Sequence, residues 1–168
     1  MRTTSTSIDT LIENSLRSFI EDIFDQSWYG KEREAVSLYA LGYLANYCQP
    51  QTILYNPTQI GIEVRVPKAT GLGKKAEICK DLVIWPRPGM TCWTKEKRVE
   101  NYPLAILEWK VNQSRVFNDD VEWLRAFSVS ASTPFTGYAL CVDLKQRHFR
   151  LSCTKIQEGK TEPNWLVI

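Results

Sequence analysis

Three charged residues interrupt two strongly apolar stretches of the sequence. Asp81 lies within ICKDLVIWP, and Glu108 and Lys110 lie within LAILEWKV. If both stretches are strands, the two-residue period of a strand places Glu108 and Lys110 on the same face. Two carboxylates and a lysine on an apolar wall cost too much free energy unless a bound cation or ion pairs neutralise them. These residues therefore predict either a cation site or a structural ion-pair cluster.

The chemistry that such a cation site could perform is specific. Carboxylate oxygens suit Mg²⁺, which keeps several waters and lets a phosphate oxygen complete its coordination shell. A metal held in this way polarises a phosphate and promotes ionisation of a bound water, while a lysine orients that water or stabilises the developing charge. Neither histidine nor cysteine is needed. The single histidine, His148, excludes a multi-histidine metal site, and the five cysteines form no CxxC pair.

Length and composition favour one ordinary soluble domain. The chain has 168 residues, of which 43% are hydrophobic and 24% charged, so it can bury a core without disulfides. The odd number of cysteines argues against a secreted disulfide framework. The N-terminus lacks an apolar leader and no apolar stretch approaches the length of a membrane span. We therefore expect a cytoplasmic protein without a membrane partner.

Positive charge is concentrated in one segment, although the net charge is only +2. Residues 65–110 contain ten basic and five acidic side chains, whereas residues 1–34 contain four basic and seven acidic ones. A polyanion-binding face requires such a concentration if the fold brings the side chains together. Two interpretations of the loop cations stay open, phosphate contact and loop solubility. The candidate nucleic-acid contacts are Lys74, Lys75, Lys95, Lys97 and Arg98.

The hydrophobic periodicity predicts an α/β fold. Apolar residues recur every three or four positions in residues 8–24, as in an amphipathic helix, and residues 60–67 alternate as a half-buried strand does. Strands 77–86 and 103–111 can pair as a hairpin, which would bring Asp81 and Glu108 together. A crossover helix between strands implies a mixed sheet of about five strands flanked by helices. The expected elements are helices 8–24, 31–47 and 118–131, and strands 60–67, 77–86, 103–111, 137–144 and 148–156.

The spacing of the charged residues resembles a family signature. Asp81, a gap of 26 residues and then Glu108-Trp109-Lys110 is similar to the D…ExK pattern of the PD-(D/E)XK nuclease superfamily. The predicted element order over residues 31–153 resembles that family's core. The resemblance implies a restriction-endonuclease-like three-layer fold in one domain, residues 1–168, with helix 8–24 outside the core. It further implies that Asp81, Glu108 and the backbone carbonyl of Trp109 bind Mg²⁺, with Mn²⁺ as a substitute, and that Lys110 is catalytic.

The sequence departs from the family pattern at one position and leaves two others open. Lys80 precedes Asp81 where the family name has proline, and strand alternation predicts that Lys80 points away from the face of Asp81. Many members add a glutamate from the first core helix. We assign this role to Glu34 rather than Glu32 because Glu34 directly precedes the buried run, although an acid at a helix N-terminus is also favoured by the helix dipole. Gln113 is a further candidate for assisting Lys110.

The resemblance implies a Mg²⁺-dependent nuclease that hydrolyses DNA phosphodiester bonds, in restriction, repair or defence against foreign DNA. The alternative is an inactive nuclease-like module that binds nucleic acid or protein, because a fold alone does not guarantee activity. No sequence-reading element is evident, so we expect target choice to come from a homodimer or a partner protein. The apolar face of residues 8–24 is a candidate interface, and capping the chain's own sheet is its alternative role.

Overall fold

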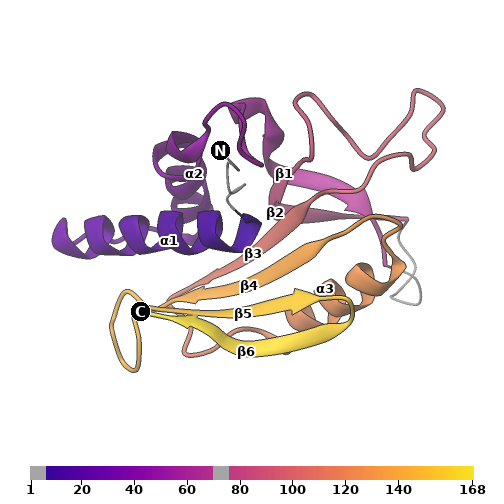
Figure 1. Cartoon of the computed structure of the whole chain (residues 1–168). Coiled ribbons are helices and arrows are strands. Elements are labelled where there is room, and N and C mark those ends of the chain that lie inside the picture. The colour runs from indigo at the N-terminus through magenta and orange to yellow at the C-terminus, as the bar shows by residue number, and fades with distance from the viewer. Residues whose placement is uncertain (1–6, 70–75) are drawn as a thin grey trace.

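A computed structural model of the chain describes residues 7–69 and 76–168, which form a mixed six-stranded sheet with helices on both faces (Figure 1). The strands lie side by side in chain order. All neighbours are antiparallel except β3 and β4, which are parallel and are joined by a helical crossover. The strands are β1 (Ile60–Pro67), β2 (Glu77–Ile84), β3 (Ala105–Val111), β4 (Thr136–Val142), β5 (Leu151–Gln157) and β6 (Lys160–Val167).

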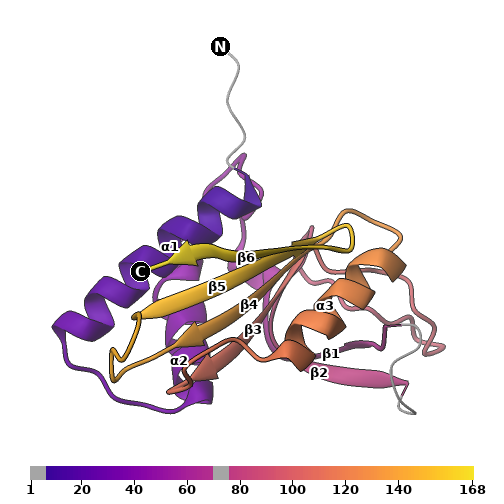
Figure 2. The same ribbon diagram turned by 90° about the horizontal axis from the view of Figure 1, so that it is seen from below.

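Two helices cover one face of the sheet and one covers the other (Figure 2). Helix α1 (Ile8–Asp25) begins at Ser7, whose hydroxyl accepts a hydrogen bond from the backbone N–H of Thr10. Helix α2 (Glu32–Gly42) precedes the sheet, and α3 (Asn118–Ser130) forms the crossover. Short 3₁₀ turns, η1 (Leu44–Tyr47) and η2 (Pro57–Gln59), lie between α2 and β1. In the described part of the chain, no helix is long and apolar enough to cross a membrane.

The helices form two separate cores with the sheet. The first core lies under α1 and α2, where Phe19 and Tyr39 pack on Trp109 of β3. The second lies under α3, where Trp123 and Phe127 stack with ring centroids 4.9 Å apart. Each core contains side chains from one face of the sheet, because successive side chains of a strand point to opposite faces. The result is a three-layer arrangement of helices, sheet and helix.

Sequence periodicity predicted the fold class, and the structure confirms an α/β protein with a mixed sheet. The expected number of about five strands is wrong, because the C-terminal segment forms β6. Pro163 cannot donate a ladder hydrogen bond, and the β5–β6 register shifts between Cys153 and Lys155. Most of β6 is exposed, which explains the missing apolar alternation. The expected helix 31–47 is also shorter, ending at Gly42 before η1.

The apolar face of α1 is buried against this chain's own sheet and not left free for a partner. A polar contact fixes the start of the helix. Asp9 accepts a hydrogen bond from the hydroxyl of Tyr138 in β4 and pairs with the ammonium of Lys155 in β5, both at 2.5 Å. We call these three residues the α1 clasp. It joins positions that are 129 and 146 residues apart in the chain.

Candidate functional site

The candidate site lies where β2 separates from β3. The two strands pair only from Leu82–Ile84 to Ala105–Leu107. Beyond this point, Oδ2 of Asp81 accepts a hydrogen bond of 2.8 Å from the backbone N–H of Trp109. The carbonyl of Trp109 in turn accepts a hydrogen bond of 2.8 Å from the Lys110 ammonium. In a regular ladder the backbone N–H and carbonyl of Trp109 would pair with β2. At the gap they instead contact the side chains of Asp81 and Lys110.

A local irregularity in β1 and β2 creates this arrangement. Glu63 has a left-handed backbone conformation, with φ of 52°, in the middle of β1. Opposite this region, the neighbours Asp81 and Leu82 both lie on the α2 side of the sheet, which breaks the alternation of β2. The break places Lys80 on the α3 side, against Glu108. The expectation that Lys80 points away from the face of Asp81 holds, but the same shift also separates Asp81 from the face of Glu108.

Lys110 lies between the two helical layers. Its ammonium is 3.4 Å from a carboxylate oxygen of Asp120 at the start of α3 and 3.8 Å from one of Glu32 at the start of α2. Burial by itself lowers the pKa of Lys110, but the nearby carboxylates, Asp120 first and then Glu32, raise it above the usual value. Lys110 therefore stays protonated at neutral pH and supplies a fixed positive charge.

Glu108 is buried on the α3 side of the sheet. Its side chain is only 5% exposed, and its Oε1 is paired with the ammonium of Lys80. Burial raises the pKa of Glu108 to about 8; the nearby Asp81 adds to the rise and Lys80 opposes it. Because burial disfavours the charged form of Glu108, a further positive charge close to it would stabilise the carboxylate.

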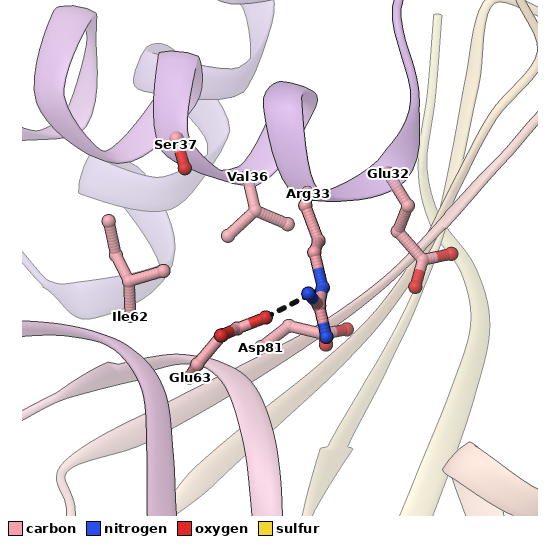
Figure 3. Close-up of a pocket in the computed structure, with 7 residues that line it drawn as sticks. All are labelled: Glu32, Arg33, Val36, Ser37, Ile62, Glu63 and Asp81. Atoms are coloured by element: carbon pink, nitrogen blue, oxygen red, sulfur yellow. Dashed lines mark ion pairs between the residues drawn. The ribbon is translucent and has the colours of Figure 1, made fainter.

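A small pocket opens on the α2 side of the gap (Figure 3). Its volume is about 160 Å³, which gives room for several water molecules. Arg33 forms an ion pair of 2.9 Å with Glu63 beside Asp81. Burial raises the pKa of Glu32, and Asp81 and Asp120 add to the rise while Lys110 opposes it. The lining residues are Glu32, Arg33, Val36, Ser37, Ile62, Glu63 and Asp81.

The choice of Glu34 over Glu32 as the helical acid is corrected by the structure. Oε2 of Glu34 accepts a hydrogen bond of 2.7 Å from the backbone N–H of Lys31, so its carboxylate caps the N-terminus of α2. Glu32 lies in the same helical turn but lines the pocket with Asp81 and approaches Lys110. The acid near the cluster is thus Glu32, and Glu34 has the capping role that the helix dipole favours.

Gln113 is not brought to the cluster. Its side chain is exposed in the turn after β3, and its backbone carbonyl accepts a hydrogen bond from the thiol of Cys141. The turn is fixed from another side, because Arg147 donates a hydrogen bond to the backbone carbonyl of Asn112. Gln113 therefore helps to end the strand, and the described contacts give its amide no part in the site.

Three of the candidate nucleic-acid contacts lie in the connection between β2 and β3. Lys95, Lys97 and Arg98 are exposed there. The connection folds back beside β1, where the indole N–H of Trp93 donates a hydrogen bond to the backbone carbonyl of Arg65. Arg98 pairs with Glu96 of the same connection and not with the cluster. Lys74 and Lys75 fall outside the residues that the structure describes.

Sequence reasoning missed four charged residues of the site. Lys80 was expected to point away from the face of Asp81, but its pairing with Glu108 was not predicted, because the break in alternation depends on β1, a different segment. Asp120 reads from sequence as an ordinary acid in the first turn of a helix. Arg33 and Glu63 carried no signal, because exposed charges at a helix start and in an edge strand are common. Their pairing depends on how α2 packs beside β1.

The oxygen atoms of the cluster are of the kind that Mg²⁺ prefers, but they are not gathered around one point and two lysines contact them. Hard oxygens come from Glu32, Asp81, Glu108 and the carbonyl of Trp109. Within residues 7–69 and 76–168, no three carboxylate, imidazole or thiol side chains lie close enough together to hold an ion. Lys80 is paired with Glu108, and Lys110 with the Trp109 carbonyl. With Asp120 included, four carboxylates face two ammonium groups, which leaves an excess of negative charge that a divalent cation would neutralise.

No protein-family model, curated protein or solved structure matches this chain. A function therefore has to be inferred from the chemistry of the cluster.

Proposed function

We propose that the protein is a Mg²⁺-dependent nuclease that hydrolyses DNA phosphodiester bonds, with a restriction-endonuclease-like fold. The observation that carries this proposal is the convergence of Asp81, Lys110 and Glu32 on the gap between β2 and β3. The D…ExK spacing of the sequence is a second, independent support. DNA as the substrate, and restriction, repair or defence as the setting, come from the family resemblance.

Each residue has a role in this proposal. The family resemblance assigns the metal to Asp81, Glu108 and the carbonyl of Trp109. Asp81 and Glu32 line the pocket, whereas Glu108 lies on the α3 side in its pair with Lys80. When bound, Mg²⁺ polarises the phosphate and lowers the pKa of a bound water. Lys110 is kept protonated by Asp120 and Glu32, so its ammonium can hold the attacking water or stabilise negative charge that develops on the phosphate.

Arg33 is the best-placed cation for a substrate phosphate. Its guanidinium is exposed at the rim of the pocket and is held there by Glu63 (Figure 3). A phosphate can replace the carboxylate of Glu63, because a guanidinium binds both groups with the same planar pair of N–H donors. The pairing with Glu63 thus keeps Arg33 beside Asp81 until a substrate arrives.

A second candidate is an inactive module with a nuclease-like fold. The ion pair between Lys80 and Glu108 favours it, since a buried lysine can neutralise a carboxylate permanently. Calorimetric titration with Mg²⁺ and Mn²⁺ separates the two candidates. Binding that is lost in Asp81→Asn supports the nuclease, and the absence of binding supports the module.

The nuclease proposal is tested with purified protein on plasmid, linear, branched and single-stranded DNA in Mg²⁺ and in Mn²⁺. We expect cleavage by the wild type and a loss of at least about 100-fold in Glu108→Gln, which removes a proposed metal ligand, and in Lys110→Met, which removes a charge that would act on the reacting phosphate. Circular dichroism verifies that both variants fold. Lys160→Met on β6 is the matched control and should cleave like the wild type. Cleavage that survives in both site variants would refute the proposal.

A further inference from the structure

A second pocket opens at the end of β3, next to the candidate site. Residues 29–32 and Glu34 line it on one side, and Val111 and Asn112 on the other. Its volume is about 400 Å³, which is in the range of pockets that hold small organic groups. Glu32 lines both this pocket and the smaller one beside Asp81. We call this space the β3-end pocket.

Tyr29 gives the β3-end pocket an exposed aromatic wall. Its side chain lies in the turn between α1 and α2 and is 65% exposed. The backbone is held on both sides of it. The N–H of Trp28 donates a hydrogen bond of 2.8 Å to the carbonyl of Ile23, and a Cβ at Gly30 would collide with the ring of Trp28, which packs on the first core. A ring that is exposed on such a fixed turn is a platform on which another flat group can stack.

Asn112 gives the same pocket an amide in a fixed position. Its N–H donates a hydrogen bond of 2.7 Å to the carbonyl of Val142, and its own carbonyl accepts one of 3.2 Å from Arg147. Its side-chain oxygen is buried and has no hydrogen-bond partner within residues 7–69 and 76–168. Buried polar atoms are rarely left unpaired, and an amide can both donate to and accept from the edge of a nucleobase.

The charges around the pocket favour a neutral group inside it. The carboxylates of Glu32 and Glu34 line the pocket and would repel a phosphate there. Cations adjoin the lining. Lys31 is exposed, Arg147 donates to a lining residue, and the ammonium of Lys110 lies 3.8 Å from a carboxylate oxygen of Glu32. A nucleotide meets both conditions, because its base is neutral and its phosphate is anionic.

We propose that the β3-end pocket holds one unpaired base of a DNA strand whose adjoining phosphate lies at Lys110. Tyr29 stacks on the base, and the amide of Asn112 hydrogen-bonds to its edge. This inference rests on the proposed function, because it names the substrate class of the same site. That class is DNA with unpaired bases, such as single strands and flaps, since a base inside a duplex is paired and stacked and has to be flipped out first.

The test is the affinity for a fluorescein-labelled single-stranded oligonucleotide and for the matching blunt duplex, measured by fluorescence anisotropy in EDTA so that neither is cleaved. We expect the wild type to bind the single strand at least about fivefold more tightly than the duplex. Tyr29→Ala and Asn112→Gly should each weaken single-strand binding by at least about fivefold and leave duplex binding nearly unchanged. Glycine accepts the backbone φ of 61° at position 112, so this variant removes the amide without strain.

Two controls separate stacking from a general effect of losing a tyrosine. Tyr29→Phe keeps the ring and should bind like the wild type. Tyr55→Ala removes an exposed tyrosine between η1 and η2 and should also bind like the wild type. Circular dichroism verifies that every variant folds.

The outcomes distinguish this inference from the proposed function. Unchanged single-strand affinity in Tyr29→Ala, or equal affinity of the wild type for the two forms of DNA, would overturn the role of the pocket. The proposed function survives these results if the wild type still cleaves DNA in Mg²⁺. Absence of both DNA binding and cleavage in the wild type would overturn both.

Discussion

At the residue scale, Asp81 connects the backbone of β3 to the candidate cation site. One of its carboxylate oxygens accepts the N–H of Trp109, which fixes the side chain at the gap between the strands. The neighbouring acids and lysines then set each other's protonation. Asp120 and Glu32 raise the pKa of Lys110, and burial raises the pKa of Glu108 to about 8 against the opposing effect of Lys80. Raised pKa values of this kind occur at reactive sites, and ion-pair networks also produce them.

Another carboxylate, Asp143, supports the end of β3. It is fully buried and accepts hydrogen bonds from the guanidinium and backbone of Arg147 and from the backbone N–H of Lys145. Arg147 also reaches the carbonyl of Asn112, two residues after Lys110. Burial by itself raises the pKa of Asp143, but the hydrogen bonds from Arg147 and Lys145 lower it below the usual value.

This depressed pKa predicts a stability that depends on pH. Asp143 adds to the free energy of unfolding at pH values above the pKa of an unfolded aspartate, about 4. This stabilisation is lost as the pH falls through the lower pKa that Asp143 has in the folded protein. We expect Asp143→Asn to lower the free energy of unfolding by about 1–3 kcal/mol at pH 7. The difference from the wild type should shrink at pH 3. Urea unfolding at both pH values measures it, with Asp25→Asn at the exposed end of α1 as the control. A difference that is constant with pH would contradict the assigned role.

At the element scale, the irregular middle of β1 determines which residues meet at the site. Glu63 adopts a positive φ, which L-residues other than Asn and Asp rarely accept. Gly61 allows the chain to pass close to Val64, since a Cβ at position 61 would lie 2.4 Å from its Cγ2 atom. The register is the same on both sides of this region, with Ile62 opposite Leu82 and Val64 opposite Lys80. The strand thus stays paired while its side chains change faces.

The substitution Glu63→Val tests whether the positive φ of residue 63 or ordinary strand propensity governs stability at this position. Valine is favoured in regular strands, so propensity predicts that Glu63→Val is neutral or stabilising. A β-branched side chain at positive φ is strained, and we expect a loss of about 1–2 kcal/mol in the free energy of unfolding. Glu63→Gly, which removes both the strain and the contact with Arg33, should be close to neutral. Thermal and urea unfolding compare the two variants, and a more stable Glu63→Val protein would contradict the positive φ.

At the scale of the whole molecule, the α1 clasp joins the first helix to the centre of the sheet. Asp9 supplies one carboxylate to Tyr138 and Lys155 on neighbouring strands. Tyr138 is fully buried, so its hydroxyl needs an acceptor. The clasp therefore couples α1 to β4 and β5, in addition to the apolar packing beneath the helix.

Removing the clasp should weaken the entire fold. We expect Asp9→Ala to lower the free energy of unfolding by about 1–3 kcal/mol, because it leaves a buried hydroxyl without its acceptor and a lysine without its partner. Asp25→Ala, at the exposed end of the same helix, is the matched control and should change little. Fluorescence and circular dichroism should report one coincident transition. An unfolding transition of α1 that precedes the loss of the sheet would contradict the coupling.

The periodicity of the sequence predicted those features that depend on residues close together in the chain. The two-residue period correctly placed Glu108 and Lys110 on the face opposite Trp109, and the helical period located α1. Contacts between distant segments determined the rest. The surroundings of Lys80 depend on Glu63, the choice between Glu32 and Glu34 depends on which one caps α2, and β6 is recognised only by its pairing with β5. The charged pattern thus indicated a candidate site, but the contacts among its residues could be known only from the fold.

The central claim is that the charge of Asp81 serves metal-dependent cleavage of DNA. Asp81→Asn tests it most directly, because asparagine keeps an oxygen that can accept the N–H of Trp109 while it removes the charge. The measurement is the rate of plasmid nicking in Mg²⁺ by the wild type and by Asp81→Asn at equal concentration, with EDTA as the blank. We predict nicking by the wild type that EDTA abolishes, and a rate at least about 100-fold lower in the folded variant. Equal rates in the two proteins, or nicking by neither, would contradict the claim.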